Sequence, residues 1–518
     1  MARRAQPLSP AAGYGAALLV AALILGTLAA VALRAEPGRG LVTADWAAVR
    51  FTLLQAGLSA LISVALAVPV ARALARRRFA GRSLLIALLG APFILPVIVA
   101  ILGLLAVFGR AGWVSDALEL FGLEPLSIYG LHGVVLAHVF FNLPLATRLI
   151  LQGWQEIPVE RFRLAAQLDA GPRAMWQLLE APMLTRVVPG ALAVVFAICL
   201  SSFAVALTLG GGPRATTIEL AIYQAFSFDF DLGRAALLSA VQLLLTALAA
   251  MIALRAPVGE GFGSGLDRML RRWDGRGAMA RGFDGFWILF AALFLLLPLL
   301  AVVLSGLPGV LSLPASVWQA AGASILVAGA STLILLALAL PMALAAALGR
   351  PLPMEVTGLL GLAASPLVIG TGLFILIYPV ASPFALALPV TALVNAVMAL
   401  PFAMRILIPA ARDVITRHRR LALSLDMTGR PFILWVVLPR MRAQIGFAAG
   451  LAAALSMGDL GVITLFADPE VATLPLQVYR LMGAYQMQAA AGAALVLLCL
   501  SMGAFWILDR GGRWHAEA

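Results

Sequence analysis

Lysine is absent from this 518-residue chain, and charged residues of all kinds make up only 12% of it. A soluble globular domain carries about 25% charged residues. Hydrophobic residues account for 62% of the sequence, and the mean hydropathy is +1.01. The composition therefore excludes an ordinary soluble domain and indicates an integral membrane protein.

The sequence also has little of the chemistry that enzymes and metal sites require. Its two cysteines, Cys199 and Cys499, lie in apolar runs without a CxxC pattern, and its four histidines are scattered. This argues against a disulfide framework and a metal site. No GxxxxGKS/T, GxSxG or HExxH motif is present. We expect no catalytic residue, metal or cofactor on this chain; any ATP used for transport, with its magnesium, must bind to another subunit.

All of the basic charge is arginine, and the formal net charge is +12. A strongly basic chain is sometimes a nucleic-acid binder, but here the arginines form short tracts between apolar runs. Arginine-rich loops retained in the cytoplasm are the ordinary explanation. We therefore expect membrane lipid, and no nucleic acid, around this chain.

Apolar runs long enough to cross a membrane recur along the whole sequence. A hydrocarbon core of about 30 Å requires about 20 residues of helix, and a helix satisfies its backbone hydrogen bonds internally. The fold class is therefore all-α. Twelve transmembrane helices are predicted, at 11–33, 51–74, 84–108, 130–151, 187–209, 235–254, 286–305, 319–348, 356–379, 384–408, 443–466 and 487–508.

The loops between these runs alternate in arginine content. Those after the second, fourth, sixth and tenth runs are rich in arginine, whereas 305–318 and 380–383 contain none. Because arginine-rich loops stay in the cytoplasm, the alternation predicts that both termini are cytoplasmic. The first run follows Arg3 and Arg4 but lacks a convincing cleavage site, so we interpret it as an uncleaved helix.

A polar, arginine-flanked segment occurs twice, as ERFRLAAQLDAGPRAMWQLLEAP at 160–182 and as RLALSLDMTGRPFILWVVLP at 420–439. The copies match at a constant offset of 257 residues, and TTIELAIYQ at 216–224 is echoed by ATLPLQVYR at 472–480. Both halves begin inside and contain an even number of helices. The sequence therefore predicts two parallel six-helix halves.

This repeat divides the chain into five parts, with the polar stretch 255–284 between the halves. The predicted parts are 1–46 (first helix and periplasmic loop), 47–254 (first transmembrane domain), 255–314 (cytoplasmic linker and seventh helix), 315–508 (second transmembrane domain) and 509–518 (cytoplasmic tail).

Each duplicated segment predicts a short helix with a compact apolar face. Leu164 and Leu168 lie four residues apart, as do Leu421 and Leu425, and residues at this spacing share a helix face. Gly171-Pro172 and Gly429-Arg430-Pro431 are predicted to end the helices. Such a helix is suited to dock into a groove of a soluble partner; the alternative is a helix resting on lipid headgroups or on its own bundle.

The two segments resemble the cytoplasmic loop of binding-protein-dependent ABC importer permeases, whose pattern is roughly Glu-Ala-Ala, a later glycine and a distal proline. Leu164 and Leu421 replace the glutamate, Leu423 replaces the second alanine, and Gly171 and Gly429 come late or are displaced. In that family the loop is a coupling helix that sits in a cleft of the ATPase. The resemblance assigns this role to Leu164, Ala165, Ala166, Leu168, Asp169, Gly171, Pro182, Leu421, Ala422, Leu425, Asp426, Gly429 and Pro439.

The resemblance covers nearly the whole chain, because fusion of two type I permease halves marks a subgroup that includes ferric-iron and thiamine permeases. Within it, SSFAVALTLGGGPRATTIELAIYQAFSFDFDLGRAA at 201–236 closely resembles the thiamine permeases. The implied function is inward transport of thiamine or its phosphates. A ferric-iron permease, a twelve-helix secondary transporter and a membrane scaffold remain as alternatives.

The family implies a multi-pass protein of the bacterial inner membrane with two kinds of partner. Two copies of a cytoplasmic ABC ATPase would close on the two coupling helices, and a periplasmic substrate-binding protein would dock on the outer loops. When the two ATPase subunits close, the halves would rotate and the translocation path would open outward. ATP hydrolysis would return the path to its inward-facing state.

One ionisable residue, Asp459, falls near the middle of the predicted helix 443–466, and Ser202 is its counterpart in the first half. An ionisable group at bilayer depth costs roughly 2.5–3.5 kcal/mol, so it usually faces a cavity or a partner. We expect Asp459 and Ser202 to lie in a translocation path, where a carboxylate favours a cationic thiazolium. The alternative is a structural aspartate bonded to backbone amides near Gly458 and Gly461.

Overall fold

The computed structural model describes residues 7–35, 40–90, 94–210, 212, 215–255, 277–349, 351–466 and 471–513. Every regular element in these ranges is a helix, which confirms the all-α prediction. Most of the predicted linker, at 256–276, lies outside the described residues, as do 514–518 of the predicted tail.

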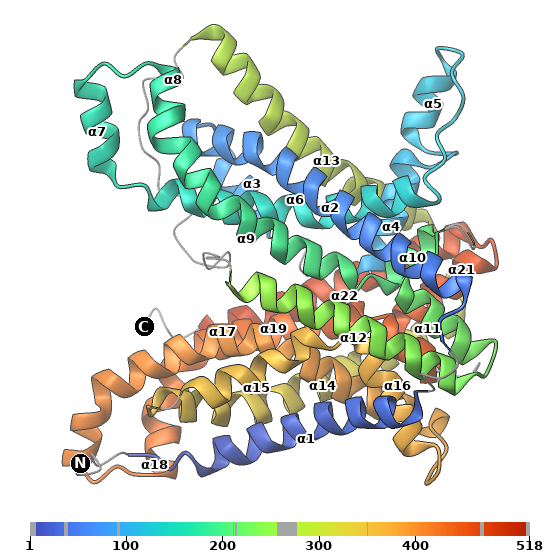
Figure 1. The fold of residues 1–518 in the computed structure, drawn as a ribbon, viewed down its shortest axis with the longest axis vertical. Coiled ribbons are helices and arrows are strands. Elements are labelled where there is room, and N and C mark those ends of the chain that lie inside the picture. Colours follow the sequence, from blue (N-terminus) through green and yellow to red (C-terminus); the bar gives the residue numbers. More distant parts are fainter. Residues whose placement is uncertain are drawn as a thin grey trace.

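The helices of the first half follow the apolar runs of the sequence (Figure 1). They are α1 (Ala11–Arg34), α2 (Thr43–Arg76), α3 (Arg82–Leu88), α4 (Val97–Phe108), α5 (Trp113–Glu119), α6 (Leu131–Glu156), α7 (Val159–Gln167), α8 (Pro172–Met175), α9 (Ala181–Leu200), α10 (Phe203–Leu209), α11 (Ile218–Ser227) and α12 (Leu232–Arg255).

The second half repeats this order with two differences: the counterparts of α6 and α7 form one helix, and a 3-10 turn, Phe384–Leu386, stands in the place of α5. Its helices are α13 (Ala278–Val310), α14 (Ala315–Ala347), α15 (Pro351–Ala363), α16 (Pro366–Ile377), α17 (Ala387–Ser424), α18 (Arg430–Phe432), α19 (Leu438–Gly458), α20 (Gly461–Phe466), α21 (Leu474–Gly483) and α22 (Met487–Arg513).

In the described part of the chain, eleven helices are long and apolar enough to cross a membrane, or twelve if the bent pair Pro351–Gly361 and Pro366–Ile377 counts as one span. This confirms a multi-pass membrane protein. The pair bends by 87°, and α3 and α4 are interrupted at the equivalent place. The predicted continuous helices 84–108 and 356–379 are therefore wrong. Pro96 directly precedes α4 and Pro366 is the first residue of α16, and proline has no N–H to donate to a preceding turn.

The internal repeat extends to individual hydrogen bonds. Helices α11 and α21 each have ten residues and lie 256 residues apart. At the start of α11, the Ile218 N–H donates to Thr52 Oγ1 at 2.9 Å. At the start of α21, the Leu474 N–H donates to Ser324 Oγ at 2.7 Å. The two halves thus share one construction, as the sequence predicted.

The first helix of each half packs against the other half. Helix α1 lies against α14 and α16, and α13 lies against α2 and α4. Each also contacts the last helix of its own half, α12 or α22. The two hydrophobic cores are consequently mixed, since α1 belongs to the core of the second half and α13 to that of the first.

Helices α1 and α13, which each pack against the opposite half, are called the exchanged helices. A glycine contacts each of them closely. A Cβ atom added to Gly372 of α16 would lie 2.5 Å from the backbone oxygen of Thr27 on α1, and one added to Gly103 of α4 would clash with the backbone of Pro298 on α13. Small residues allow membrane helices to approach closely. Gly103 and Gly372 therefore fix how tightly α13 and α1 are held.

Replacing Gly372 by valine is expected to push α1 off α16 and to destabilise the protein by about 1–3 kcal/mol, the usual cost of overpacking. The measurement is the temperature at which detergent-solubilised protein loses its monodisperse gel-filtration peak. Gly15→Val is the control, because nothing lies within 4 Å of a Cβ at that position of α1. Equal stability of the two variants would contradict the assignment.

An ion-pair cluster joins α2 to both α13 and the base of the first polar segment. Arg72 contacts Glu180 at 2.7 Å and Arg77 contacts Asp284 at 2.6 Å, while Arg76 lies 3.9 Å from each carboxylate. Both carboxylates are at most 2% exposed. The residue equivalent to Glu180 in the second half is Val437, which is also buried, so an ionic contact in one half corresponds to an apolar one in the other.

Both described ends of the chain lie at the end of the bundle that carries the polar segments. Before α1, the carbonyl of Pro7 accepts a hydrogen bond from the Gly429 N–H at 2.7 Å. Near the end of α22, Gly512 packs against the backbone of Arg442, just after the second segment. Figure 1 shows α7 and α18 at this end, on the left, and α5, α11 and α21 at the other.

Candidate translocation site and coupling segments

The first polar segment forms the short helix α7 at the left edge of the bundle in Figure 1. Leu164 is 56% exposed and Leu168 is 73% exposed, although both are apolar. Beside them, Ala166 is exposed and Ala165 half-buried. Phe162 on the opposite face is buried in the first hydrophobic core. The helix is thus anchored by one face and presents a leucine pair on the other.

The second polar segment presents the same pair from the end of α17. Leu421 is 58% exposed and Leu425 is 61% exposed, whereas Ala422 is buried. Figure 1 shows the two segments at the same end of the molecule but at opposite edges of it. The protein therefore carries two equivalent, separated apolar projections.

The prediction of a separate short helix holds only for the first half. Pro158 lies between α6 and α7, and Ile157 ends α6 in an extended conformation, because the residue before a proline is disfavoured in a helix. At the position 257 residues later the chain has Ile415. Without a proline there, α17 continues unbroken from the bundle to Ser424.

Both helices end in an aspartate with left-handed backbone, with φ of 48° at Asp169 and 52° at Asp426. The next N–H donates to the carbonyl five residues earlier, at 2.9 Å in the first half and 2.8 Å in the second, which is the Schellman arrangement. The prediction that Gly171 and Gly429 end these helices is therefore wrong. Aspartate tolerates the left-handed conformation because its short polar side chain can hydrogen-bond locally.

Each segment re-enters the bundle through a five-residue π-helix, Trp176–Glu180 in the first half and Ile433–Val437 in the second. π-Helical turns are rare and occur frequently at functional sites. Pro182 and Pro439 follow in the first turns of α9 and α19. Both prolines are exposed, and neither breaks the helix.

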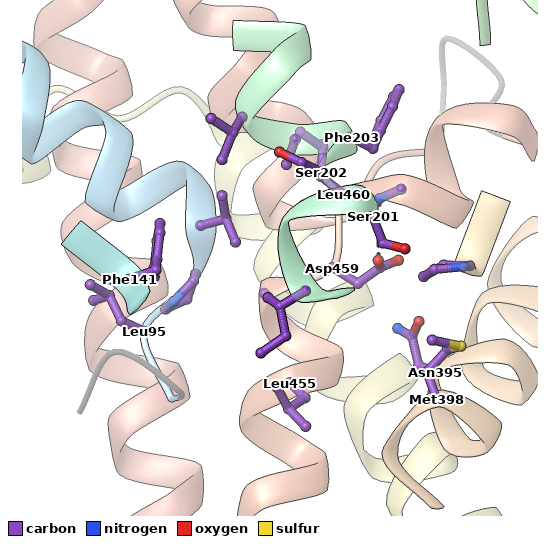
Figure 2. A pocket seen from close by; sticks show the side chains of 18 of the residues that line it. Leu95, Phe141, Ser201, Ser202, Phe203, Asn395, Met398, Leu455, Asp459 and Leu460 are labelled. Carbon is purple, nitrogen blue, oxygen red and sulfur yellow. Dashed lines mark hydrogen bonds between the residues drawn. The ribbon is translucent and has the colours of Figure 1, made fainter. Parts of the chain in front are cut away.

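A cavity of about 400 Å³ lies between the two halves. The first half contributes residues 94–97, at the start of α4, and residues of α6, α9, α10 and α11, and the second half contributes residues of α16, α17, α19 and α20. Figure 2 shows Asp459, Ser201 and Asn395 on one side of the cavity and Phe141 and Leu95 on the other. The volume falls in the usual range for small-molecule sites, about 300–1,000 Å³.

The structure places Ser202 and Asp459 in this cavity, but not inside continuous helices. Helix α9 ends at Leu200 and α19 ends at Gly458, so the predicted spans 187–209 and 443–466 are each broken. Asp459 lies at the break, where its Oδ1 accepts a hydrogen bond from the Gly461 N–H at 3.2 Å. The prediction that Asp459 lies mid-helix is therefore wrong, although its bond to a nearby backbone amide agrees with the structural alternative.

The polar residues beside the two helix breaks occupy equivalent positions in the two halves, but their side chains differ. His138 of α6 contacts Ser202 Oγ through Nε2 at 2.5 Å and Ser59 Oγ through Nδ1 at 3.2 Å. The equivalent residue of α17, Asn395, donates to Ser456 Oγ at 3.1 Å. The first half therefore lines the cavity with a histidine–serine pair, and the second half with an asparagine beside an aspartate.

Sequence reasoning missed Glu219, a second carboxylate in the cavity. It lies at the start of α11, is 1% exposed, and has Ser365 and the backbone of Phe203 beside it. The signal was present, since Glu219 is the acidic residue of the apolar string TTIELAIYQ. What the sequence lacked was any indication that α11 reaches the same cavity as Asp459.

Comparisons with known proteins agree over the full length of the chain, although no protein-family model matches it. The thiamine transport system permease protein ThiP of Brucella abortus is 40% identical over 541 residues, covering 100% of this chain and 98% of the relative. ThiP of Salmonella typhimurium is 38% identical, with 100% of both chains covered. ThiP of Escherichia coli is 38% identical, with 98% of both covered. The chain therefore belongs to the family of thiamine transport system permease proteins.

Proposed function

We propose that this chain is the permease subunit of an ATP-driven importer that carries thiamine across the bacterial inner membrane. The observation that carries the proposal is the 38–40% identity, along the whole chain, to proteins named for thiamine transport. Because the alignment spans both halves, both belong to the transport unit. The resemblance of 201–236 to thiamine permeases supports the same substrate.

The energy would come from a separate ATPase, bound as two copies with ATP and magnesium. Two exposed leucine pairs on equivalent segments support this stoichiometry, since one partner species can bind each in the same way. An amphipathic helix entering a groove of a soluble partner is a common recognition mode. The chain itself would serve as the transport subunit and perform no chemistry.

The coupling segments would face the cytoplasm, together with both termini. This orientation agrees with the arginine-rich loops and with the position of both described chain ends beside the segments. The opposite end, with α5, α11 and α21, would then receive a periplasmic thiamine-binding protein (Figure 1).

Transport would proceed by alternating access to the cavity between the halves. When the ATPase subunits approach each other, the two coupling segments would be drawn together and the halves would rotate. Because each half carries one exchanged helix of the other, a movement of either half must displace α1 or α13 as well. The cavity would open outward to receive thiamine and inward to release it.

The test is ATPase activity of the complete complex reconstituted in lipid vesicles. The substrate-binding protein is loaded with thiamine, thiamine diphosphate or ferric iron, and hydrolysis and uptake are measured. We expect stimulation and uptake with thiamine and none with ferric iron. Stimulation by ferric iron alone, or thiamine uptake that does not depend on ATP, would overturn the proposal.

A further inference from the structure

We propose that the cavity between the halves is a binding site for the cationic ring of thiamine, with Glu219 of the first half and Asp459 of the second as its two counter-charges. This inference rests on the proposed function and deepens it. It names the permease side chains that hold thiamine after the binding protein has released it and before it enters the cytoplasm.

The charge of the cavity is the first argument. Its ionisable lining residues, within the described part of the chain, are His138, Glu219 and Asp459, and no arginine is among the lining residues. One oxygen of each carboxylate, Oε1 of Glu219 and Oδ2 of Asp459, is buried without a hydrogen-bond partner among the described residues. Buried charges are normally paired, and a carboxylate inside a membrane protein commonly marks the path of a ligand or ion. A cation in the cavity would be attracted by both carboxylates.

The helix breaks place helix ends of both signs at the cavity, because α4, α11 and α16 begin there and α9 and α19 end there. Helices α9 and α19 are 20 and 21 residues long, and both end at residues beside the cavity. The C-terminal end of a helix carries partial negative charge, and such ends inside membrane transporters coordinate cations. The ends of α9 and α19 therefore offset part of the positive charge of the helix starts, and the formal negative charge of the cavity comes from its two carboxylates.

The two carboxylates do not follow the internal repeat. The hydrogen bonds of Thr52 and Ser324, the left-handed aspartates and the π-helices all occur in both halves. The counterpart of Asp459, however, is Ser202, and the counterpart of Glu219 is Pro475. An asymmetric ligand requires different groups on its two sides.

The remaining lining suits a flat heteroaromatic cation. Phe141 and Phe203 are among the residues that line the cavity, and aromatic faces attract cations and stack on rings. Ser201 and Asn395 lie on the side of Asp459 and offer hydrogen-bonding groups. The cationic thiazolium ring is common to thiamine and its phosphates, so the site would recognise the shared part of these molecules.

The experiment measures binding of radiolabelled thiamine to the purified permease–ATPase complex without the binding protein. Pyrithiamine, which keeps a cationic ring, is expected to compete, and thiochrome, a neutral oxidised form of thiamine, is not. Glu219→Gln and Asp459→Asn should each weaken binding by about 30-fold, as expected for removal of one buried charge partner. Glu355→Gln is the control, because this glutamate is exposed, pairs with Arg412 at 3.8 Å, and does not line the cavity.

Transport by the same variants separates this inference from the proposed function. In the complete complex, both variants should retain ATPase stimulation by thiamine-loaded binding protein and lose most uptake per ATP hydrolysed. Asparagine at 459 keeps a side-chain oxygen that can accept the Gly461 N–H, so a purely structural role predicts normal uptake. If wild-type protein transports thiamine and both carboxamide variants bind and transport it normally, the site assignment is overturned. If wild-type protein fails to transport thiamine at all, the proposed function is overturned instead.

Discussion

Arginine in place of both Leu168 and Leu425 is expected to reduce ATP-dependent thiamine uptake by about 30-fold or more while the protein still inserts into the membrane. These leucines are 73% and 61% exposed, at positions 257 residues apart. Central apolar contacts of an interface commonly contribute 2 kcal/mol or more each, and a guanidinium in the groove that receives a leucine would be desolvated. We expect basal hydrolysis by the ATPase to continue without coupling to transport.

Gln167→Arg and Ser424→Arg provide the matched controls. Each is an exposed position directly before one of the leucines, and it therefore points about 100° away around the helix. These variants add the same charge and keep the leucine pair. Uptake at the wild-type rate in the Leu168/Leu425 double variant would mean that the segments rest on lipid headgroups and do not couple the ATPase.

Asp284→Asn is expected to cause the largest loss of stability, about 3–5 kcal/mol, because it breaks a buried ion pair and leaves a positive charge uncompensated. Asp284 is 1% exposed and contacts Arg77 at 2.6 Å. The pair holds α13 against α2 at the end of the bundle that carries the two polar segments. The measurement is the temperature at which the detergent-solubilised variant loses its monodisperse gel-filtration peak, compared with that of the wild type.

Asp413→Asn tests whether burial is the cause. Asp413 pairs with Arg417 at 2.7 Å, nearly the same distance, but the two side chains are 53% and 71% exposed. An exposed pair of this kind contributes about 0.3–0.5 kcal/mol. A similar, small effect in both variants would show that the Arg77–Asp284 contact does not hold α13 in place.

The repeat could be predicted from the sequence because it depends on residue identity at a fixed offset. The exposed leucine pairs followed from it, since i and i+4 spacing defines a helix face regardless of tertiary context. The continuity of helices could not be predicted in the same way. Hydropathy is averaged over a window, so apolar residues on both sides of Ser201-Ser202 or Asp459-Leu460 conceal a break between two helices.

The packing of the helices against one another was the second feature that the sequence could not predict. The alignment of the two halves with each other relates α1 to α13, but it does not show that each packs on the opposite half. For the same reason Asp459 was identified as a candidate from its charge alone, whereas Glu219 acquired meaning only when α11 was seen to reach the cavity between the halves. The sequence identified Asp459 through its charge within an apolar run, and the packing of α11 identified Glu219.

The exchange of α1 and α13 imposes an order on biosynthesis. During translation the first half enters the bilayer before α13 exists, so the surface of α4 around Gly103 stays in contact with lipid or the insertion machinery until Pro298 has been synthesised. Helix α1, made first, similarly waits for α14 and α16. The first half therefore cannot complete its packing as an independent unit. A chain terminated between the halves would lack the helix that closes its own core, which gives a physical reason for keeping both halves on one polypeptide.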